Sequence, residues 1–288
     1  MTALRSRLPW LVAVGLVALF APTVMWLWER WTLSVWHNAH GLLLVPVVAY
    51  FIYEELQRQR HLPSSSTPWG FAILIPALAL HAVDAGMNTQ LLAAVALILT
   101  LPGLSLLFLG VERTKAIAFP LFLLVLALPI PLSFTETIHL QLRHLATAGT
   151  AAIVPYFGIP VFVEGTTLHM AAGALQVADA CSGFSTLHAA IAVSLLTAYL
   201  TPSVPRRVLV LLAAAPIAIA SNVLRIILLV VMVVWRGPDV LETFIHPLSG
   251  LMTFALSLPL IFWLGGNEQR REVETPTPPV APAAEAQG

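Results

Sequence analysis

Apolar residues fill most of this chain in long stretches, and polar residues are confined to the connections between them. Eight such stretches stand out, at residues 11–28, 37–53, 69–83, 90–109, 116–132, 183–200, 208–235 and 247–264. A helix that crosses the hydrocarbon core of a bilayer needs about 20 mostly apolar residues, with roughly 17–25 tolerated. The pattern therefore predicts an all-α polytopic membrane protein with about eight transmembrane helices. The seventh stretch is long enough to tilt or to project from the membrane.

The composition agrees with a membrane protein. Of 288 residues, 58% are hydrophobic and 10% are charged, whereas a soluble domain carries about 25% charged residues. The first stretch is too long for the apolar core of a signal peptide and lacks a clear small-residue cleavage site, so we interpret it as a retained helix. The net charge is zero and no basic stripe is present, which gives no indication of a nucleic-acid partner. No zinc-type Cys/His spacing, phosphate-binding glycine loop or haem motif indicates a metal or cofactor.

The basic residues alternate between two sets of connections. One set holds ten of them: Arg5, Arg7, Arg58, Arg60, Arg113, Lys115, Arg206, Arg207, Arg270 and Arg271. The opposite set holds three: Arg30, Arg143 and Arg236. Because cytoplasmic loops carry the excess of Lys and Arg, both termini are predicted to be cytoplasmic. Residues 1–264 form the membrane domain, and the Pro-, Ala- and Glu-rich residues 265–288 are expected to be a disordered cytoplasmic tail.

One sizeable segment, residues 133–180, is predicted to lie outside the bilayer on the extracytoplasmic side. Pro129 and Pro131 should end the fifth helix just before it. Residues 134–154 have apolar positions at helical spacing and predict an amphipathic helix near the membrane surface. The apolar face is formed by Ile138, Leu142 and Leu145, and the polar face by Glu136, Gln141 and Arg143. Two β-prone runs around residues 171–173 predict a β-hairpin whose second strand leads towards residue 181.

Cys181 is the single cysteine of the chain and follows Asp179 and Ala180 at the start of the sixth apolar stretch. Ser182 and Gly183 supply turn chemistry and a possible helix cap there. Backbone N–H groups and the macrodipole at a helix N-terminus favour negative charge, which would lower the pKa of a thiol and make it more nucleophilic. A small buried packing residue is the alternative reading of Cys181.

Arg225 lies well inside the seventh apolar stretch. An arginine at such a depth costs at least about 2.5–3.5 kcal/mol on insertion scales, so it normally faces the protein interior or an aqueous cavity and has a partner. Asn222, three residues earlier, shares its helical face. A purely structural arginine that bonds to backbone carbonyls is the alternative.

His246 precedes Pro247 at the predicted extracytoplasmic start of the last helix. An imidazole with an ordinary pKa near 6.5 can act as an acid or a base at neutral pH, although a histidine at this level is also a common interfacial residue. Cys181, Arg225 and His246 come from three helices that could enclose one pocket, as nucleophile, charge stabiliser and proton carrier. His40 and His188 are expected to line this pocket or to support it, while the other histidines receive no role.

These residues together resemble the exosortase/archaeosortase family. The resemblance is carried by Ala180-Cys181-Ser182-Gly183, by Asn222-Val223-Leu224-Arg225 and by His246-Pro247-Leu248-Ser249-Gly250. It extends to His40-Gly41, to Pro129-Ile130-Pro131 and to Gly158-Ile159-Pro160-Val161, and covers roughly residues 36–264. Asp179 stands where many members have Glu, and residues 184–186 lack an arginine that many members carry.

The resemblance implies a membrane cysteine protease or transpeptidase in the bacterial inner membrane, with its active site facing the extracytoplasmic side. Its substrates would be exported proteins with a C-terminal sorting signal: a short motif similar to Pro-Glu-Pro, an apolar helix and a basic end. Cys181 would form an acyl-enzyme, His246 would move protons, and Arg225 would stabilise the thiolate or the oxyanion. An acceptor nucleophile, which the family resemblance does not identify, would release the product. No cofactor is implied.

Two other classes of function remain open from the sequence. A transporter or channel could use Arg225 to bind an anion, although no internal repeat supports the repeated halves of many transporters. A scaffold for envelope or polysaccharide assembly would leave Cys181 inert. A lipid acyltransferase that needs a lysine beside the thiol is disfavoured, because the one lysine, Lys115, is assigned to the cytoplasmic side.

Overall fold

A computed structural model describes residues 2–32, 40–63, 65–178 and 182–266. Its α-helices are α1 (Thr2–Thr32), α2 (His40–Arg58), α3 (Gly70–Met87), α4 (Leu91–Phe108), α5 (Val111–Ala116), α6 (Ala118–Leu123), α7 (Leu132–Ile153), α8 (Phe184–Leu200), α9 (Val204–Arg236) and α10 (Ile245–Gly265). Its 3₁₀ helices are η1 (Leu124–Ala127), η2 (Val154–Phe157) and η4 (Pro238–Glu242), and its strands are β1 (Phe162–Glu164), β2 (Thr167–Met170) and β3 (Gly173–Gln176).

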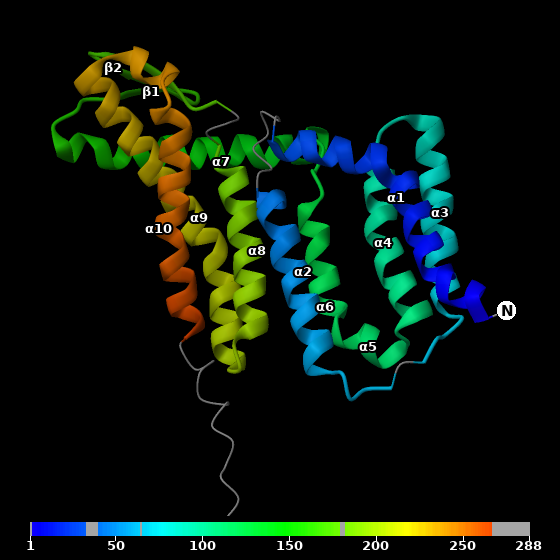
Figure 1. Cartoon of the computed structure of the whole chain (residues 1–288). Helices are drawn as coiled ribbons and strands as arrows, with labels where there is room; N and C mark the ends of the chain where they lie inside the picture. The colour runs from blue at the N-terminus through cyan, green and yellow to red at the C-terminus, as the bar shows by residue number, and fades with distance from the viewer. Residues whose placement is uncertain (1, 33–39, 64, 179–181, 267–288) are drawn as a thin grey trace, which may run out of the picture.

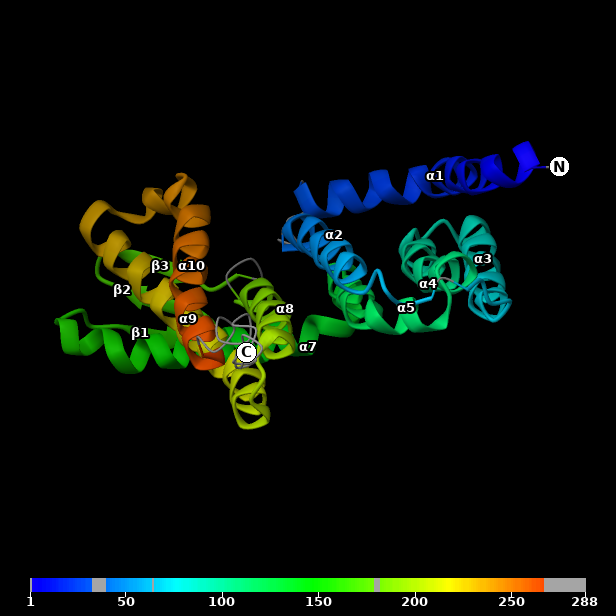
Figure 2. The ribbon, with the colours of Figure 1, turned by 60° about the horizontal axis from the view of Figure 1, so that its bottom comes forward.

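Most helices stand upright side by side, and α7 runs across one end of them (Figure 1). The small sheet lies at that same end, beside α7 and the C-terminal part of α9. A second view separates α1–α6 from the group formed by α7–α10 and the sheet (Figure 2). The starts of α8 and α10 therefore lie near α7, which is the end of the molecule where the sequence placed the candidate chemistry.

Three buried apolar clusters hold these elements together. The first joins α2 to α6 and η1 and is centred on Val48, Leu121 and Leu123. The second joins the sheet to α7 and α9 through Leu168, Leu175, Val177, Ile226, Leu229 and Val230. The third joins α8, α9 and α10 through Ala190, Val210, Ala218 and Ile261. Since α9 takes part in two of the clusters, it is the element that connects the sheet to the upright helices.

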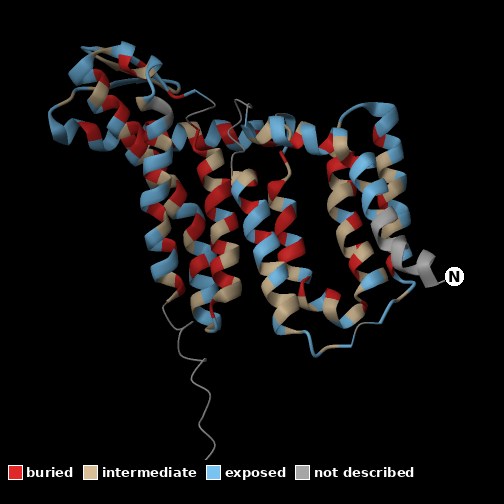
Figure 3. Cartoon of the chain, in the orientation of Figure 1, coloured by how far each residue is buried: buried red, intermediate tan, exposed pale blue. Residues whose placement is uncertain are grey.

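Five described helices are long and apolar enough to cross a membrane. They comprise 12–32, 70–87, 91–108, 204–236 and 248–265, and less than half of an 18-residue apolar segment of each is buried within the protein. Large apolar side chains such as Leu43, Phe71, Leu212 and Trp263 are exposed, and the helices have both buried and exposed faces (Figure 3). Many exposed large apolar side chains on long apolar helices are typical of contact with lipid. The chain is therefore an integral membrane protein.

The prediction of a continuous fifth helix over 116–132 was wrong. The chain is helical in three short pieces there, with α5 ending at Ala116 and a turn at Ile117 before α6 and η1. The apolar helical part, Ala118–Ala127, is about 15 Å long, half the hydrocarbon thickness. Pro129 follows in a non-helical segment and Pro131 in extended backbone just before α7, as expected for residues that cannot continue a helix.

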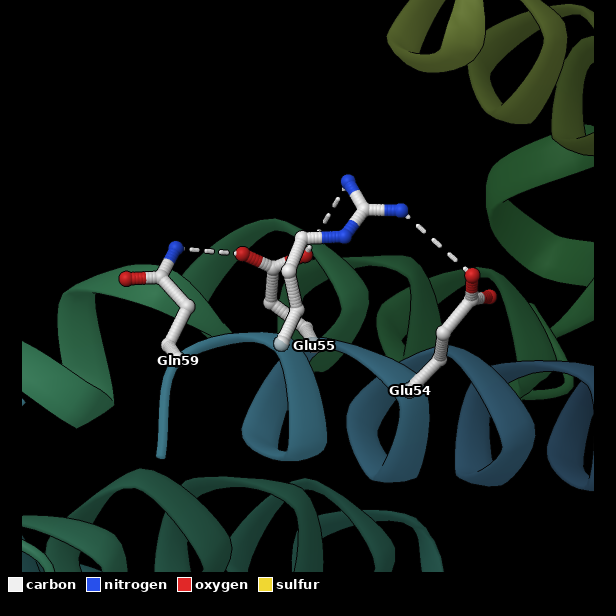
Figure 4. Close-up of polar contacts among 4 residues, drawn as sticks. Glu54, Glu55 and Gln59 are labelled. Carbon is white, nitrogen blue, oxygen red and sulfur yellow. Dashed lines mark hydrogen bonds and ion pairs between the residues drawn. The ribbon is translucent and has the colours of Figure 1, made fainter. Parts of the chain in front are cut away.

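The helix α2 is also absent from the five long apolar helices, because its last turns are polar. Glu54, Glu55 and Gln59 gather at the end of α2 (Figure 4). Arg58 Nη2 lies 3.4 Å from Glu54 Oε1, and Gln59 donates a hydrogen bond to Glu55. The apolar part of α2, from 41 to 53, is about 20 Å long. The predicted number of eight spans therefore stays a prediction.

The predicted hairpin is the second half of a three-stranded antiparallel sheet in the order β1-β2-β3. Thr167 pairs with Gln176 and Met170 with Gly173, so β2 and β3 turn at residues 171–172 as expected. The first of the two predicted β-prone runs is not one strand. It is broken at Gly165 and Thr166, and β1 pairs back on β2 with Phe162 opposite His169. The sheet packs its buried Leu168 and Leu175 against α7 and α9.

The amphipathic helix lies where it was predicted, and the structure adds which of its faces packs within the protein. Of the predicted apolar face, Ile138 and Leu145 are exposed and Leu142 is buried. The buried face is a stripe at spacings of three and four residues, comprising Thr135, His139, Leu142, Ala146 and Thr150. Small and hydroxyl-bearing side chains allow α7 to pack closely across α9, with Gly149 against Val223, whereas the larger apolar residues point away from the protein.

Candidate functional site

The turn that precedes α8 is held from two sides. Asn222 Nδ2, from α9, donates a hydrogen bond of 3.1 Å to the backbone carbonyl of Ser182. The Ser182 hydroxyl lies 2.9 Å from Nδ1 of His139, from α7. Ser182 is 1% exposed, so both bonds are shielded from water. Cys181 and Asp179 lie outside the described residues, but Cys181 is the immediate neighbour of this fixed residue in the chain.

Gly183, rather than Ser182, is the N-cap of α8. Its φ of +84° lies in the left-handed region, which a residue without Cβ enters at little cost. The Ser182 hydroxyl accepts a hydrogen bond of 3.3 Å from the backbone N–H of Phe184, so Ser182 still satisfies one of the first N–H groups of the helix. The predicted cap chemistry is therefore present, shifted by one residue.

Arg225 is buried in α9 and reaches α10. It is 6% exposed, and its Nε donates a hydrogen bond of 3.2 Å to Oγ of Ser249. Gly250 leaves room for the guanidinium, since a Cβ there would lie 3.1 Å from Cζ of Arg225. The expected interior position and a polar partner are both observed. Arg225 and Asn222 are separated by one helical turn, so they lie on the same side of α9.

His246 lies in the first turn of α10, while its side chain is outside the described part of the structure. It precedes Ser249 by three residues, a rise of about 4.5 Å along the helix axis. The described contacts thus join Ser182 to Asn222 on α9 and Arg225 on α9 to Ser249 on α10, with Asn222 and Arg225 one helical turn apart. Arg225 makes one of these contacts, Cys181 precedes Ser182 in the chain, and His246 precedes Ser249 by three residues.

His40 and His188 form a separate pair between α2 and α8. Their ring centroids are 4.4 Å apart, and Nε2 of His40 lies 3.0 Å from the Leu126 carbonyl oxygen. Nδ1 of each ring is buried without a hydrogen-bond partner among the described atoms. Phe184 connects this pair to the site, since its ring centroid lies 6.0 Å from that of His188. A supporting position fits both histidines better than direct contact with Cys181, which precedes His188 by about two helical turns.

His139 was not identified from the sequence. The buried stripe on α7 is the signal that could have found it, because His139 occupies a position in that stripe between Thr135 and Leu142. Its ring also packs on Phe184, with centroids 4.5 Å apart. The large exposed residues of α7 dominated the periodicity of the sequence and concealed this stripe.

The surroundings of the turn are apolar and closely packed. A small cavity between α7, α8 and α9 is lined by Leu142, Ala146, Ala218 and Ile219 beside Ser182 and Asn222. It has room for about one water molecule. In the described part of the chain, no group of three or more His, Cys, Asp or Glu residues could hold a metal ion.

A comparison with protein-family models matches residues 28–263 to the transmembrane exosortases. The chain belongs to this family. No curated protein and no solved structure matched the chain. The family match spans both buried contacts, that of Asn222 with Ser182 and that of Arg225 with Ser249, and also includes Cys181 and His246. The turn before α8 is therefore the place to test exosortase chemistry.

Replacing Gly183 by alanine should destabilise the protein more than a left-handed backbone alone explains. The added Cβ would lie 2.5 Å from Cγ of Asn222, so Asn222 would have to leave its bond to Ser182. We expect roughly 1–2 kcal/mol from the backbone conformation and about 1–3 kcal/mol more from the clash. Thermal unfolding of the purified protein in detergent measures both.

Gly158→Ala is the matched control for this prediction. Gly158 also has a positive φ, +76°, but a Cβ there would meet nothing within 4 Å. Its variant should show the backbone cost without the clash. Equal shifts in Tm for Gly158→Ala and Gly183→Ala would contradict the proposed close contact between Gly183 and Asn222.

Proposed function

We propose that this exosortase is a membrane cysteine transpeptidase that cleaves C-terminal sorting signals from exported proteins and transfers the remaining chain to an acceptor. The observation that carries the proposal is a pair of buried polar contacts made from one face of α9: Asn222 bonds to Ser182, and Arg225, one helical turn further on, bonds to Ser249. A buried arginine is thereby joined to the helix that carries His246, one turn of α9 away from the residue that holds the turn after Cys181.

The reaction begins with the thiolate of Cys181, which attacks the carbonyl carbon of the scissile peptide bond. The tetrahedral intermediate collapses to a thioester, the C–N bond breaks, and the leaving amine takes a proton from the imidazolium of His246. An acceptor nucleophile then loses its proton to His246 and attacks the thioester. This second step forms the new acyl bond, breaks the C–S bond and returns Cys181 as the thiolate, with the proton of the acceptor on His246.

Arg225 supplies the positive charge in this scheme. A buried guanidinium stabilises a neighbouring anion far more than an exposed one does, because little water screens it. Preorganised donors directed at a developing oxyanion are commonly the largest single contribution to such catalysis. With Nε engaged by Ser249, the planar group is held in one orientation. Its place one turn from Asn222 puts it on the α9 face that meets the Ser182 turn.

The substrate would approach from the extracytoplasmic side of the bacterial inner membrane, where the basic residues place α7, the sheet and the start of α8. A C-terminal signal with its own apolar helix would lie in the lipid beside the protein. Its cleavage motif, similar to Pro-Glu-Pro, would reach the site near the membrane surface. The exposed Phe134 and Tyr156 on α7 and η2 suit a position at the lipid–water boundary.

The proposal is tested with an exported reporter protein that carries a C-terminal sorting signal, co-expressed with the exosortase in a host that lacks one. We expect a shortened reporter whose new C-terminus, read by mass spectrometry, lies within the motif. Hydroxylamine, which attacks thioesters, should release a reporter hydroxamate from the enzyme. Transport or assembly functions predict an unprocessed reporter and no hydroxamate, and either result would reject the transpeptidase.

A further inference from the structure

We propose that His139 is a positioning residue for the nucleophile: by holding the Ser182 hydroxyl, it fixes to the amphipathic helix α7 the turn that follows Cys181 in the chain. This inference rests on the proposed function and extends it to an element that contributes none of the three predicted catalytic residues. The motif around Cys181 would then depend on α7 for its geometry, in addition to the bond from Asn222.

The contact between His139 and Ser182 is a buried, specific hydrogen bond. His139 is 6% exposed and Ser182 is 1% exposed, and their polar atoms are 2.9 Å apart across 43 residues of sequence. A buried hydroxyl or imidazole without a partner would cost about 1–3 kcal/mol. Each side chain therefore stabilises the other in one arrangement, and the loss of either should release the turn.

The hydrogen-bonding capacity of Ser182 suits a bond to His139 in either direction. A serine hydroxyl has one proton to donate and two acceptor positions, and the backbone N–H of Phe184 uses one acceptor position. The proton and the second acceptor position remain for Nδ1 of His139 in either tautomer. An asparagine amide at position 139 could likewise accept or donate this bond, whereas leucine could do neither. The ring of His139 also rests on Phe184 at 4.5 Å, so α7 contacts the start of α8 on both sides of the Gly183 cap.

The experiment compares His139→Leu, His139→Asn and Ser182→Ala in the full-length protein, with the tailed reporter as substrate. We expect His139→Leu to lower kcat by roughly 10- to 100-fold with little change in KM, since small misplacements of a reacting group have effects of this size. Ser182→Ala should lower kcat by a similar factor. His139→Asn should recover most of the activity. His144→Leu, an exposed position on the same helix, should behave as wild type.

The double variant His139→Leu/Ser182→Ala separates positioning from independent damage. Residues that act through one bond show strongly non-additive effects, so the double variant should be no slower than the slower single variant. Multiplied losses would overturn the proposal, as would a wild-type kcat in either His139→Leu or Ser182→Ala. If His139→Leu does not accumulate in the membrane, Ser182→Ala and His139→Asn still decide, because equal kcat in wild type and Ser182→Ala would reject the role.

Because Cys181 is the single cysteine of the chain, its alkylation by a small uncharged reagent such as iodoacetamide reports on the nucleophile alone. The rate should change at least several-fold in His139→Leu and return towards wild type in His139→Asn. An unchanged alkylation rate in His139→Leu would count against positioning.

Failure of the inference is distinguishable from failure of the proposed function. Normal activity of His139→Leu together with inactivity of Cys181→Ala would reject only the role of His139. Activity of Cys181→Ala would reject the transpeptidase itself.

Discussion

Cys181→Ala is expected to abolish processing of a tailed reporter, with a loss of at least about 1,000-fold in rate. No other thiol in the chain can replace it, since the sequence contains one cysteine. Without the nucleophile no thioester forms, so the hydroxylamine-sensitive species should disappear together with the product. Quantitative mass spectrometry of reporter and product, at equal amounts of enzyme in the membrane, measures the change.

Cys181→Ser is the companion variant. It keeps a small polar side chain at the position, but an alcohol has a far higher pKa than a thiol and needs an adjacent base to become nucleophilic. We expect it to accumulate and unfold as wild type does and to process the reporter as poorly as Cys181→Ala. Normal processing by Cys181→Ala would return Cys181 to the role of an inert packing residue and would favour the scaffold.

The positions of most helices follow from apolar stretches alone. A run of about 20 apolar residues has few structural options in a membrane, because every backbone polar group must be satisfied internally. The sixth and eighth stretches, 183–200 and 247–264, accordingly become α8 and α10 with ends displaced by a few residues. The prediction of one helix for the fifth stretch fails because hydropathy does not reveal where a helix breaks. Residues 116–132 are as apolar as their neighbours, but the helix ends at Ala116, the chain turns at Ile117, and short helical pieces follow.

For the candidate site too, some features could be predicted from the sequence and others could not. The burial of Arg225 could be predicted because a charge within an apolar helix has to face the protein interior. Its partner Ser249 lies 24 residues away on another helix, and helical periodicity carries no information about such a pairing. The bond between Asn222 and Ser182 spans 40 residues and was inaccessible for the same reason. His139 was overlooked because the apolar periodicity of 134–154 marks the face of large apolar residues, whereas the face of α7 that packs in the protein consists mostly of hydroxyl-bearing and small side chains around His139.

Arg225→Lys is expected to lower the rate of reporter processing by roughly 100- to 1,000-fold, the usual cost of removing one donor from an oxyanion site. Lysine keeps the positive charge but loses the planar fork, so it cannot bond to Ser249 through an Nε-type donor and still present two further N–H groups to substrate. The variant therefore distinguishes geometry from charge. The measurement is single-turnover processing of the reporter, together with the amount of thioester that accumulates.

Two further variants are needed to interpret the activity of Arg225→Lys. Arg236→Lys is the matched control, since Arg236 is an exposed residue at the end of the same helix and its replacement should leave both processing and Tm unchanged. Arg225→Met removes the charge but retains the apolar stem, and should be at least as slow as Arg225→Lys. Full activity in Arg225→Lys would reduce Arg225 to a simple charge. Full activity in Arg225→Met would exclude a catalytic role for Arg225, because a catalytic guanidinium cannot be replaced by a thioether without loss of transition-state stabilisation.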